Sequence, residues 1–146
     1  MHTIQSIKIS DTADILRSVS LRVTEQRIAV YDILVKKKCA LSIENILSLL
    51  TININESTAY RIVEQFIEKG LVRKMYFQTG KTFFEIMTDH HHHHIVCTQC
   101  HDIEEVSLCV LDKNIQSVID GSRKFSTVSD HMLEFFGICK TCKRKK

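Results

Sequence analysis

Two Cys-x-x-Cys pairs constrain this chain more than any other feature. The first pair, Cys97 and Cys100, ends a run over residues 89–100 that also holds an aspartate and five consecutive histidines. The second pair, Cys139 and Cys142, lies close to the C-terminus. A two-residue spacing lets both sulfurs of a pair face one ion, and two pairs supply the four thiolates of a closed tetrahedral zinc site. We therefore predict a structural Zn²⁺ that joins the C-terminus to the first pair.

A redox switch of the same thiols is the alternative interpretation of the four cysteines. The other two cysteines, Cys39 and Cys109, have no partner at metal-binding spacing. We expect both to be small buried hydrophobic residues.

The histidine run predicts further metal sites. Successive side chains of an extended segment point in opposite directions, so His92 and His94 face one way while His91 and His93 face the other. One segment can therefore serve two sites, and each site needs oxygen or nitrogen ligands from elsewhere in the chain. The candidates for these ligands are Glu85, Glu104, Glu105, Asp112 and His131.

Several classes of protein are excluded by what the sequence lacks. No apolar run reaches the ~18 residues of a membrane span, so no membrane partner is expected. The first residues have no signal-peptide pattern, which favours a cytoplasmic protein with reduced thiols. The chain has no His-Glu-x-x-His motif, and a site of four thiolates has no open coordination position, so we do not expect an enzyme.

Charge is distributed unevenly along the chain. Residues 1–86 carry 12 Lys and Arg against 9 Asp and Glu, whereas residues 87–139 have a net charge of −5. A basic first part and an acidic, His-rich second part suggest binding to a polyanion and to cations respectively.

The first part predicts four helices and a hairpin. Helices are expected from Asp11 to Val19 with Asp11 as N-cap, then from Thr24, from Ser42 and from about Ser57, the last ending at Gly70. Strands over 71–77 and 82–86 follow, joined by a turn over 78–81.

Three helices followed by a hairpin is the order of a winged helix-turn-helix, whose last helix enters the major groove of DNA. Tyr60 and Arg61 lie on the outer face of that helix, and Arg73, Lys74 and Lys81 add positive charge to the wing. A small helical domain with a solvated basic face is the alternative.

The second part predicts a small α/β domain. Strands are expected over 95–97, 103–106 and 132–138, with a helix over 111–120. The fold class is therefore α+β, with domains over residues 1–86 and 87–146.

The chain resembles the ferric uptake regulator (Fur) family of bacterial metal-sensing repressors over nearly its whole length. The first matching motifs are Arg22-Val23-Thr24-Glu25-Gln26-Arg27 and Ser57-Thr58-Ala59-Tyr60-Arg61 followed by Phe66. The others are Phe83-Phe84-Glu85, the histidine cluster that runs into Cys97-x-x-Cys100, and Cys139-x-x-Cys142.

The resemblance implies a homodimeric transcriptional repressor of metal-homeostasis genes that binds a palindromic, AT-rich double-stranded DNA operator. It implies an N-terminal winged-helix DNA-binding domain and a C-terminal metal-binding dimerisation domain. By similarity, structural zinc is held by Cys97, Cys100, Cys139 and Cys142. The family's regulatory site, at the hinge between the domains, falls on Glu85, His92, His94 and Glu105. A further site falls on His91, His93, Asp112 and His131.

The residues expected to bind DNA are Arg22, Ser57, Thr58, Tyr60, Arg61, Arg73 and Lys74. The second metal is expected to be Zn²⁺ or Fe²⁺, with Mn²⁺, Co²⁺ and Ni²⁺ as further candidates.

Two positions depart from the family pattern. A histidine expected just before the third helix is replaced by Ala40, so Cys39 or His90 would have to substitute for it. His93 stands where the family has aspartate, and nitrogen in place of oxygen shifts preference towards zinc, cobalt or nickel. A metal-buffering or thiol redox-switch protein without DNA binding is the alternative function, and it would not require the Tyr60 helix or the wing.

Overall fold

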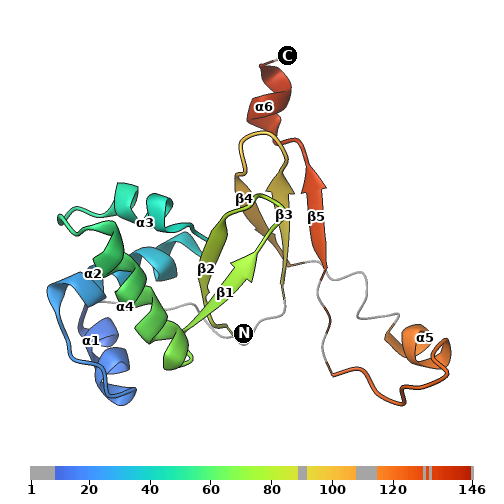
Figure 1. The fold of residues 1–146 in the computed structure, drawn as a ribbon, viewed down its shortest axis with the longest axis horizontal. Coiled ribbons are helices and arrows are strands. Elements are labelled where there is room, and N and C mark those ends of the chain that lie inside the picture. Colours follow the sequence, from blue (N-terminus) through green and yellow to red (C-terminus); the bar gives the residue numbers. More distant parts are fainter. Residues whose placement is uncertain (1–8, 89–91, 108–114, 130, 132, 146) are drawn as a thin grey trace. The chain divides into compact units, whose positions relative to one another are not determined.

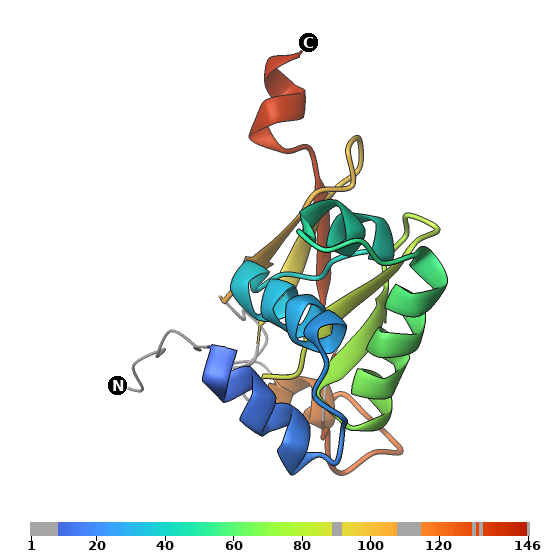
Figure 2. The ribbon, with the colours of Figure 1, turned by 90° about the vertical axis from the view of Figure 1, so that its left-hand side faces the viewer.

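The computed structural model describes residues 9–88, 92–107, 115–129, 131 and 133–145. The chain divides into two compact units, Met1–Met87 and Thr88–Lys146. In its described residues, the first unit contains four helices and a two-stranded antiparallel sheet, whose arrangement can be followed in Figures 1 and 2. Its elements are α1 (Ile9–Ser18), α2 (Glu25–Lys37), α3 (Ile43–Leu49), α4 (Glu56–Glu68), β1 (Val72–Tyr76) and β2 (Thr82–Ile86).

Side-chain caps set where three of these helices begin. Thr24 accepts a hydrogen bond from the backbone N–H of Arg27, and Ser42 forms a capping box with Asn45. These two caps confirm the predicted starts. The N-cap of α4 is Asn55, whose side chain accepts from the backbone N–H of Thr58 at 2.7 Å. α4 therefore starts one residue before the predicted position.

The predicted N-cap at Asp11 is wrong. α1 begins at Ile9, so Asp11 lies in its first turn, where a carboxylate interacts favourably with the helix dipole. The predicted helix end at Gly70 is confirmed, because Gly70 adopts a left-handed conformation with φ of +70°.

The core of the first unit lies between the helices and the hairpin. Leu34, Ile46 and Phe66 are fully buried in it, and the ring of Tyr31 packs edge-on against Phe66 with centroids 5.6 Å apart. Burial of each large apolar side chain contributes roughly 1.5–3 kcal/mol. Backbone hydrogen bonds in both directions between Leu41 and Phe84 fix the segment before α3 against β2. The hairpin is therefore part of the same folded unit as the helices.

The second unit contains a three-stranded sheet with the order β4-β3-β5, and β3 lies between its neighbours in Figure 1. β3 pairs antiparallel with β4 and parallel with β5. The elements are β3 (His93–Cys97), β4 (Ile103–Val106), α5 (Ile115–Asp120), β5 (Glu134–Gly137) and α6 (Lys140–Arg144).

The α+β fold class is confirmed. The helix predicted over 111–120 is present from Ile115, and its first four residues lie outside the described part of the chain. Helix α6 was not predicted, because its five residues are too few to show an apolar period. Within the described ranges, no helix has the length and apolar character needed to span a bilayer.

Candidate metal centre

The parallel pairing of β3 with β5 brings the two Cys-x-x-Cys pairs together. Cys97, the last residue of β3, lies opposite Gly137, the last residue of β5. The first pair continues into the turn after β3, where His101 takes a left-handed conformation and its N–H donates to the Cys97 carbonyl at 2.9 Å. The second pair follows β5, with Cys139 as the N-cap of α6. Two parallel strands that end level with each other therefore deliver both pairs to one edge of the sheet.

The four sulfurs form a compact cluster. The Sγ atoms of Cys97, Cys100, Cys139 and Cys142 all lie within 4.8 Å of one another. Cys100 Sγ and Cys139 Sγ are 3.7 Å apart. Zn–S bonds of about 2.3 Å in a tetrahedron require sulfurs about 3.8 Å apart. The donor set therefore fits zinc in chemistry and in size, and none of the four cysteines forms a disulfide here.

Backbone N–H groups stabilise the thiolate form of one of these cysteines. Hydrogen bonds from the backbones of Cys100, Cys139 and Gln99 lower the pKa of Cys97 to about 6. The Cys139 N–H lies 3.3 Å from Cys97 Sγ. Hydrogen bonding with Cys100 and Cys139 raises the pKa of Cys142 to about 12, because the clustered sulfurs share protons through these bonds. A dication would replace those protons.

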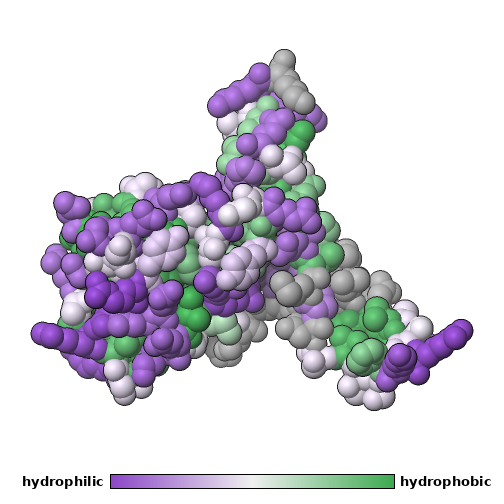
Figure 3. Space-filling view, in the orientation of Figure 1, coloured by the Kyte–Doolittle hydropathy of each residue, from purple (hydrophilic) through white to green (hydrophobic). Residues whose placement is uncertain are grey.

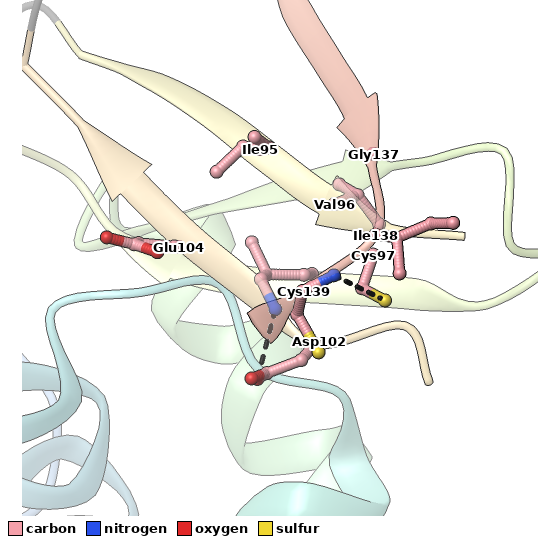
Figure 4. A pocket seen from close by; sticks show the side chains of 9 residues that line it. Ile95, Val96, Cys97, Asp102, Glu104, Gly137, Ile138 and Cys139 are labelled. Carbon is pink, nitrogen blue, oxygen red and sulfur yellow. Dashed lines mark hydrogen bonds between the residues drawn. The ribbon is translucent and has the colours of Figure 1, made fainter. Parts of the chain in front are cut away.

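A hollow beside the cluster is too small for an organic ligand. Its apolar lining comes from Ile95, Val96 and Ile138, and its acidic lining residues are Asp102 and Glu104 (Figure 4). Its volume is about 80 Å³, whereas ligand pockets usually measure about 300–1,000 Å³. At this edge of the sheet, the four cysteine sulfurs are therefore the candidate binding groups, and the hollow is not a candidate ligand pocket.

The predicted regulatory residues of the second unit lie close together. The rings of His92 and His94 are 5.0 Å apart between centroids, and both side chains are buried. Glu105 on β4 lies directly opposite His94 on β3, so their side chains share one face of the sheet. The structure thus brings His92 close to His94 and places Glu105 beside His94.

The ring of His93 lies close to that of His131 rather than to those of His92 and His94. Its ring centroid is 5.4 Å from that of His131. Nδ1 of His93 is 3.1 Å from the carbonyl oxygen of Leu133, and because a carbonyl can only accept, Nδ1 carries the proton. Nε2 of His93 is buried, and in the neutral imidazole this atom carries the lone pair that a metal ligand needs. The other two residues assigned to this site, His91 and Asp112, lie outside the described residues.

The fourth residue assigned to the regulatory site, Glu85, belongs to the first unit. It lies on β2 opposite Arg73 on β1, and its buried carboxylate accepts two hydrogen bonds from that arginine. Ala40 is buried with 3% of its surface exposed, and its methyl group offers no ligand atom. Cys39 beside it is half-buried.

The residues expected to bind DNA lie on the outer surface of the first unit. Ser57, Tyr60 and Arg61 on α4 are exposed, as are Arg22 and Lys74, while Thr58 and Arg73 are half-buried. The rings of Tyr60 and Phe84 pack in a T-shaped arrangement with centroids 6.3 Å apart, so the exposed Tyr60 ring also contacts a residue of the core. Hydrophilic residues cover much of the visible face of this unit in Figure 3.

Sequence reasoning did not assign a role to Arg27. Its guanidinium donates to the Arg22 carbonyl at 2.7 Å and to the Gln65 side chain at 2.8 Å, which joins the start of α2 to α4. A hollow lined by Arg22, Arg27 and Arg61 opens there, with no acidic residue in its wall. The three arginines come together only when α2 packs against α4, so the sequence alone could not show that they line one hollow.

The fold and the sites together define a two-unit protein with a winged-helix part and a metal-binding sheet. The ferric uptake regulator family model matches residues 18–136, and the chain belongs to this family. Its sequence is 31% identical over 137 residues to the ferric uptake regulation protein of Vibrio parahaemolyticus, covering 90% of this chain and 89% of that protein.

Solved structures agree with this assignment. The Vibrio cholerae ferric uptake regulator matches with a TM-score of 0.75 and 29% identity, covering 88% of this chain and 100% of that one. The ferric uptake regulator of Francisella tularensis, solved with iron, matches with a TM-score of 0.69 and 25% identity, covering 85% and 96%. The protein is therefore a transcription regulator and not an enzyme.

Proposed function

We propose that this protein is a metal-responsive repressor of metal-homeostasis genes, with DNA binding in residues 1–86 and metal binding and dimerisation in residues 87–146. One observation carries the proposal. A four-sulfur cluster that fits zinc occurs in the same chain as a capped helix that exposes Tyr60 and Arg61. A protein that only stores metal does not need the second feature.

Cys97, Cys100, Cys139 and Cys142 are the proposed ligands of structural Zn²⁺. Bound zinc would supply a cross-link between the ends of β3 and β5, with a free energy on the order of 10 kcal/mol. Four thiolates complete the coordination, so this site has a structural role.

The proposed regulatory metal ligands are Glu85, His92, His94 and Glu105. The proposed ligands of the additional metal site are His91, His93, Asp112 and His131. Mixed imidazole and carboxylate donors suit Zn²⁺, Fe²⁺, Mn²⁺, Co²⁺ or Ni²⁺. The Francisella tularensis relative solved with iron supports a divalent cation of this group. Since the regulatory ligands come from both parts of the sequence, occupancy of the site would influence the DNA-binding part.

α4 is the proposed recognition helix. Tyr60 and Arg61 would contact bases in the major groove, while Arg22, Ser57 and Thr58 would contact phosphates. Lys74 on the wing adds positive charge, and the ion-paired Arg73 on the same strand is also assigned to this surface.

A homodimer that binds a palindromic, AT-rich operator is the proposed assembly. Ile95, Phe135, Phe136 and Ile138 are each 37–49% exposed, and β5 is an edge strand within the described sheet. Apolar side chains gathered on and beside an edge strand are typical of an interface. Two copies related by a two-fold axis would present two recognition helices to two half-sites.

Fluorescence anisotropy with AT-rich palindromic DNA tests the proposal. We expect divalent metal to raise the DNA affinity of zinc-replete protein by about 5–150-fold. Replacement of both Tyr60 and Arg61 by Ala should abolish DNA binding and leave the zinc content unchanged. If Zn²⁺, Fe²⁺, Mn²⁺ and Co²⁺ all leave the affinity unchanged, the sensing function is wrong, and a metal-buffering or redox role gains support.

A further inference from the structure

Arg73 and Glu85 form a close ion pair across the hairpin. The two residues are direct partners in the antiparallel pairing of β1 with β2. Both Nε and Nη2 of Arg73 donate to the same oxygen of Glu85, Oε2, at 2.9 and 2.7 Å. One of the proposed regulatory ligands is therefore already neutralised by a cation that belongs to the chain.

The two partners differ in how freely they can move. The Glu85 side chain is 5% exposed, whereas the Arg73 side chain is 40% exposed. A buried carboxylate cannot turn into water without uncovering the strand around it. A guanidinium on a long, partly exposed stem can leave the pair and become hydrated more easily than the buried carboxylate can. If the pair opens, Arg73 is the side chain that moves.

A divalent ion and a guanidinium compete for this carboxylate. The proposed site has two carboxylates, those of Glu85 and Glu105, so a dication and a guanidinium together leave an excess positive charge, and the two cations repel each other strongly where water is scarce. Metal at Glu85 would therefore weaken the hold of Glu85 on Arg73. The released charge would appear on β1, next to the exposed Lys74, on the wing of the DNA-binding part.

We propose that Arg73 is an internal counter-cation that competes with the regulatory metal for Glu85 and, once displaced, binds a DNA phosphate. This inference rests on the proposed function, since it takes Glu85 as a regulatory ligand. The competition between Arg73 and the metal would set the metal concentration at which the protein responds. It also gives the DNA-binding part a direct response to metal in a chain with Ala40 at the hinge position.

Two measurements on zinc-replete protein test the exchange, with Co²⁺ as the probe because its visible absorption reports binding. The first is Co²⁺ affinity. The second is the salt dependence of DNA affinity with and without Co²⁺. Each phosphate contact adds about 0.9 to the slope of log affinity against log salt, so two protomers would steepen the slope by about 2 in the presence of Co²⁺.

Arg73→Gln removes the charge and keeps an N–H donor. We expect this variant to bind Co²⁺ severalfold more tightly than the wild type and to lose the Co²⁺-induced steepening. Lys74→Gln removes the same charge one residue away, on a side chain that packs over Tyr76 rather than on Glu85. It should keep wild-type Co²⁺ affinity, because Lys74 does not contact Glu85.

Arg73→Lys provides a second test of the same competition if the Gln variant does not fold. Lysine keeps the charge but loses the two-pronged contact, so its Co²⁺ affinity should lie above that of the wild type while the steepening persists. Weaker or unchanged Co²⁺ binding in Arg73→Gln would overturn the proposal, because Arg73 would then orient Glu85 rather than compete for it. Retained steepening in that variant would overturn it as well. A wild type whose DNA affinity ignores Co²⁺ contradicts the proposed function itself.

Discussion

Cys97 on β3 and Gly137 on β5 lie opposite each other at the matched ends of two parallel strands. Cys139 follows Gly137 by two residues, and its backbone N–H reaches back to Cys97 Sγ. Because the two strands end level with each other, the pairing of β3 with β5 brings the four cysteine sulfurs together. Conversely, a metal ion on the four sulfurs would hold β5 in the sheet, because β5 has a single strand neighbour in the described structure.

Cys139→Ser is therefore expected to lose both zinc and the structure of the second unit. Zinc content measured by elemental analysis should fall from about one ion per chain to near zero. The free energy of unfolding should fall by several kcal/mol, since metal binding contributes directly to folding. Cys39→Ser is the control, because Cys39 lies in the other unit, and it should keep its zinc. Full zinc content in Cys139→Ser would contradict the assignment of this ligand.

Asn55→Ala should weaken the start of the recognition helix. The Asn55 side chain satisfies the backbone N–H of Thr58, which has no partner within the helix. Loss of this cap is expected to cost about 1 kcal/mol in urea unfolding, whereas Asn55→Asp should retain most of the stability. Operator affinity should fall in the Ala variant, because Ser57 and Thr58 lie in the uncapped turn. Equal stability of Asn55→Ala and the wild type would show that the cap contributes nothing.

Local chemistry explains why parts of this fold could be predicted from the sequence. The helix ends at Thr24, Ser42 and Gly70 depend on contacts with residues only a few positions away, so they could be predicted from the local sequence. The spacing within each Cys-x-x-Cys pair is local as well, and the four sulfurs meet as predicted.

Contacts that depend on distant pairing could not be predicted. The Arg73–Glu85 pair requires the register of the hairpin, and the Arg27–Gln65 contact requires the packing of α2 on α4. The orientation of His93 depends on a carbonyl 40 residues further along the chain. Each of these contacts involves a residue whose type alone is compatible with an ordinary solvated surface.

Ala40→His should not restore the family's hinge ligand. Ala40 is 3% exposed and precedes Leu41, whose backbone pairs with Phe84, so the segment cannot shift freely to admit an imidazole. Overpacking of this kind costs about 1–3 kcal/mol, measurable by urea unfolding. Co²⁺ affinity should stay unchanged. A stable Ala40→His variant with tighter Co²⁺ binding would show that the segment can present a ligand after all.

Phe136→Lys should separate the proposed dimer. Phe136 lies on the edge strand β5 opposite Val96, with 41% of its surface exposed. A charge there would have to be desolvated in the interface, so light scattering should show a monomer that retains zinc and binds the operator weakly. Phe125→Lys introduces the same charge at a 73% exposed position outside the strands and should remain dimeric. A dimeric Phe136→Lys protein would place the interface elsewhere.

His93→Asp should move metal preference towards Mn²⁺ and Fe²⁺, because it replaces a nitrogen donor with oxygen. The change also removes the Nδ1–H that donates to the Leu133 carbonyl, and a carboxylate can only accept. The metal-free variant should therefore unfold at lower urea concentration than the wild type. His93→Asn is the matched control, since its amide can still donate to that carbonyl without adding a charge. Competition between Mn²⁺ and Co²⁺ in zinc-replete protein measures the preference. A ratio of affinities that is equal in His93→Asp and the wild type would show that His93 does not coordinate the exchangeable metal.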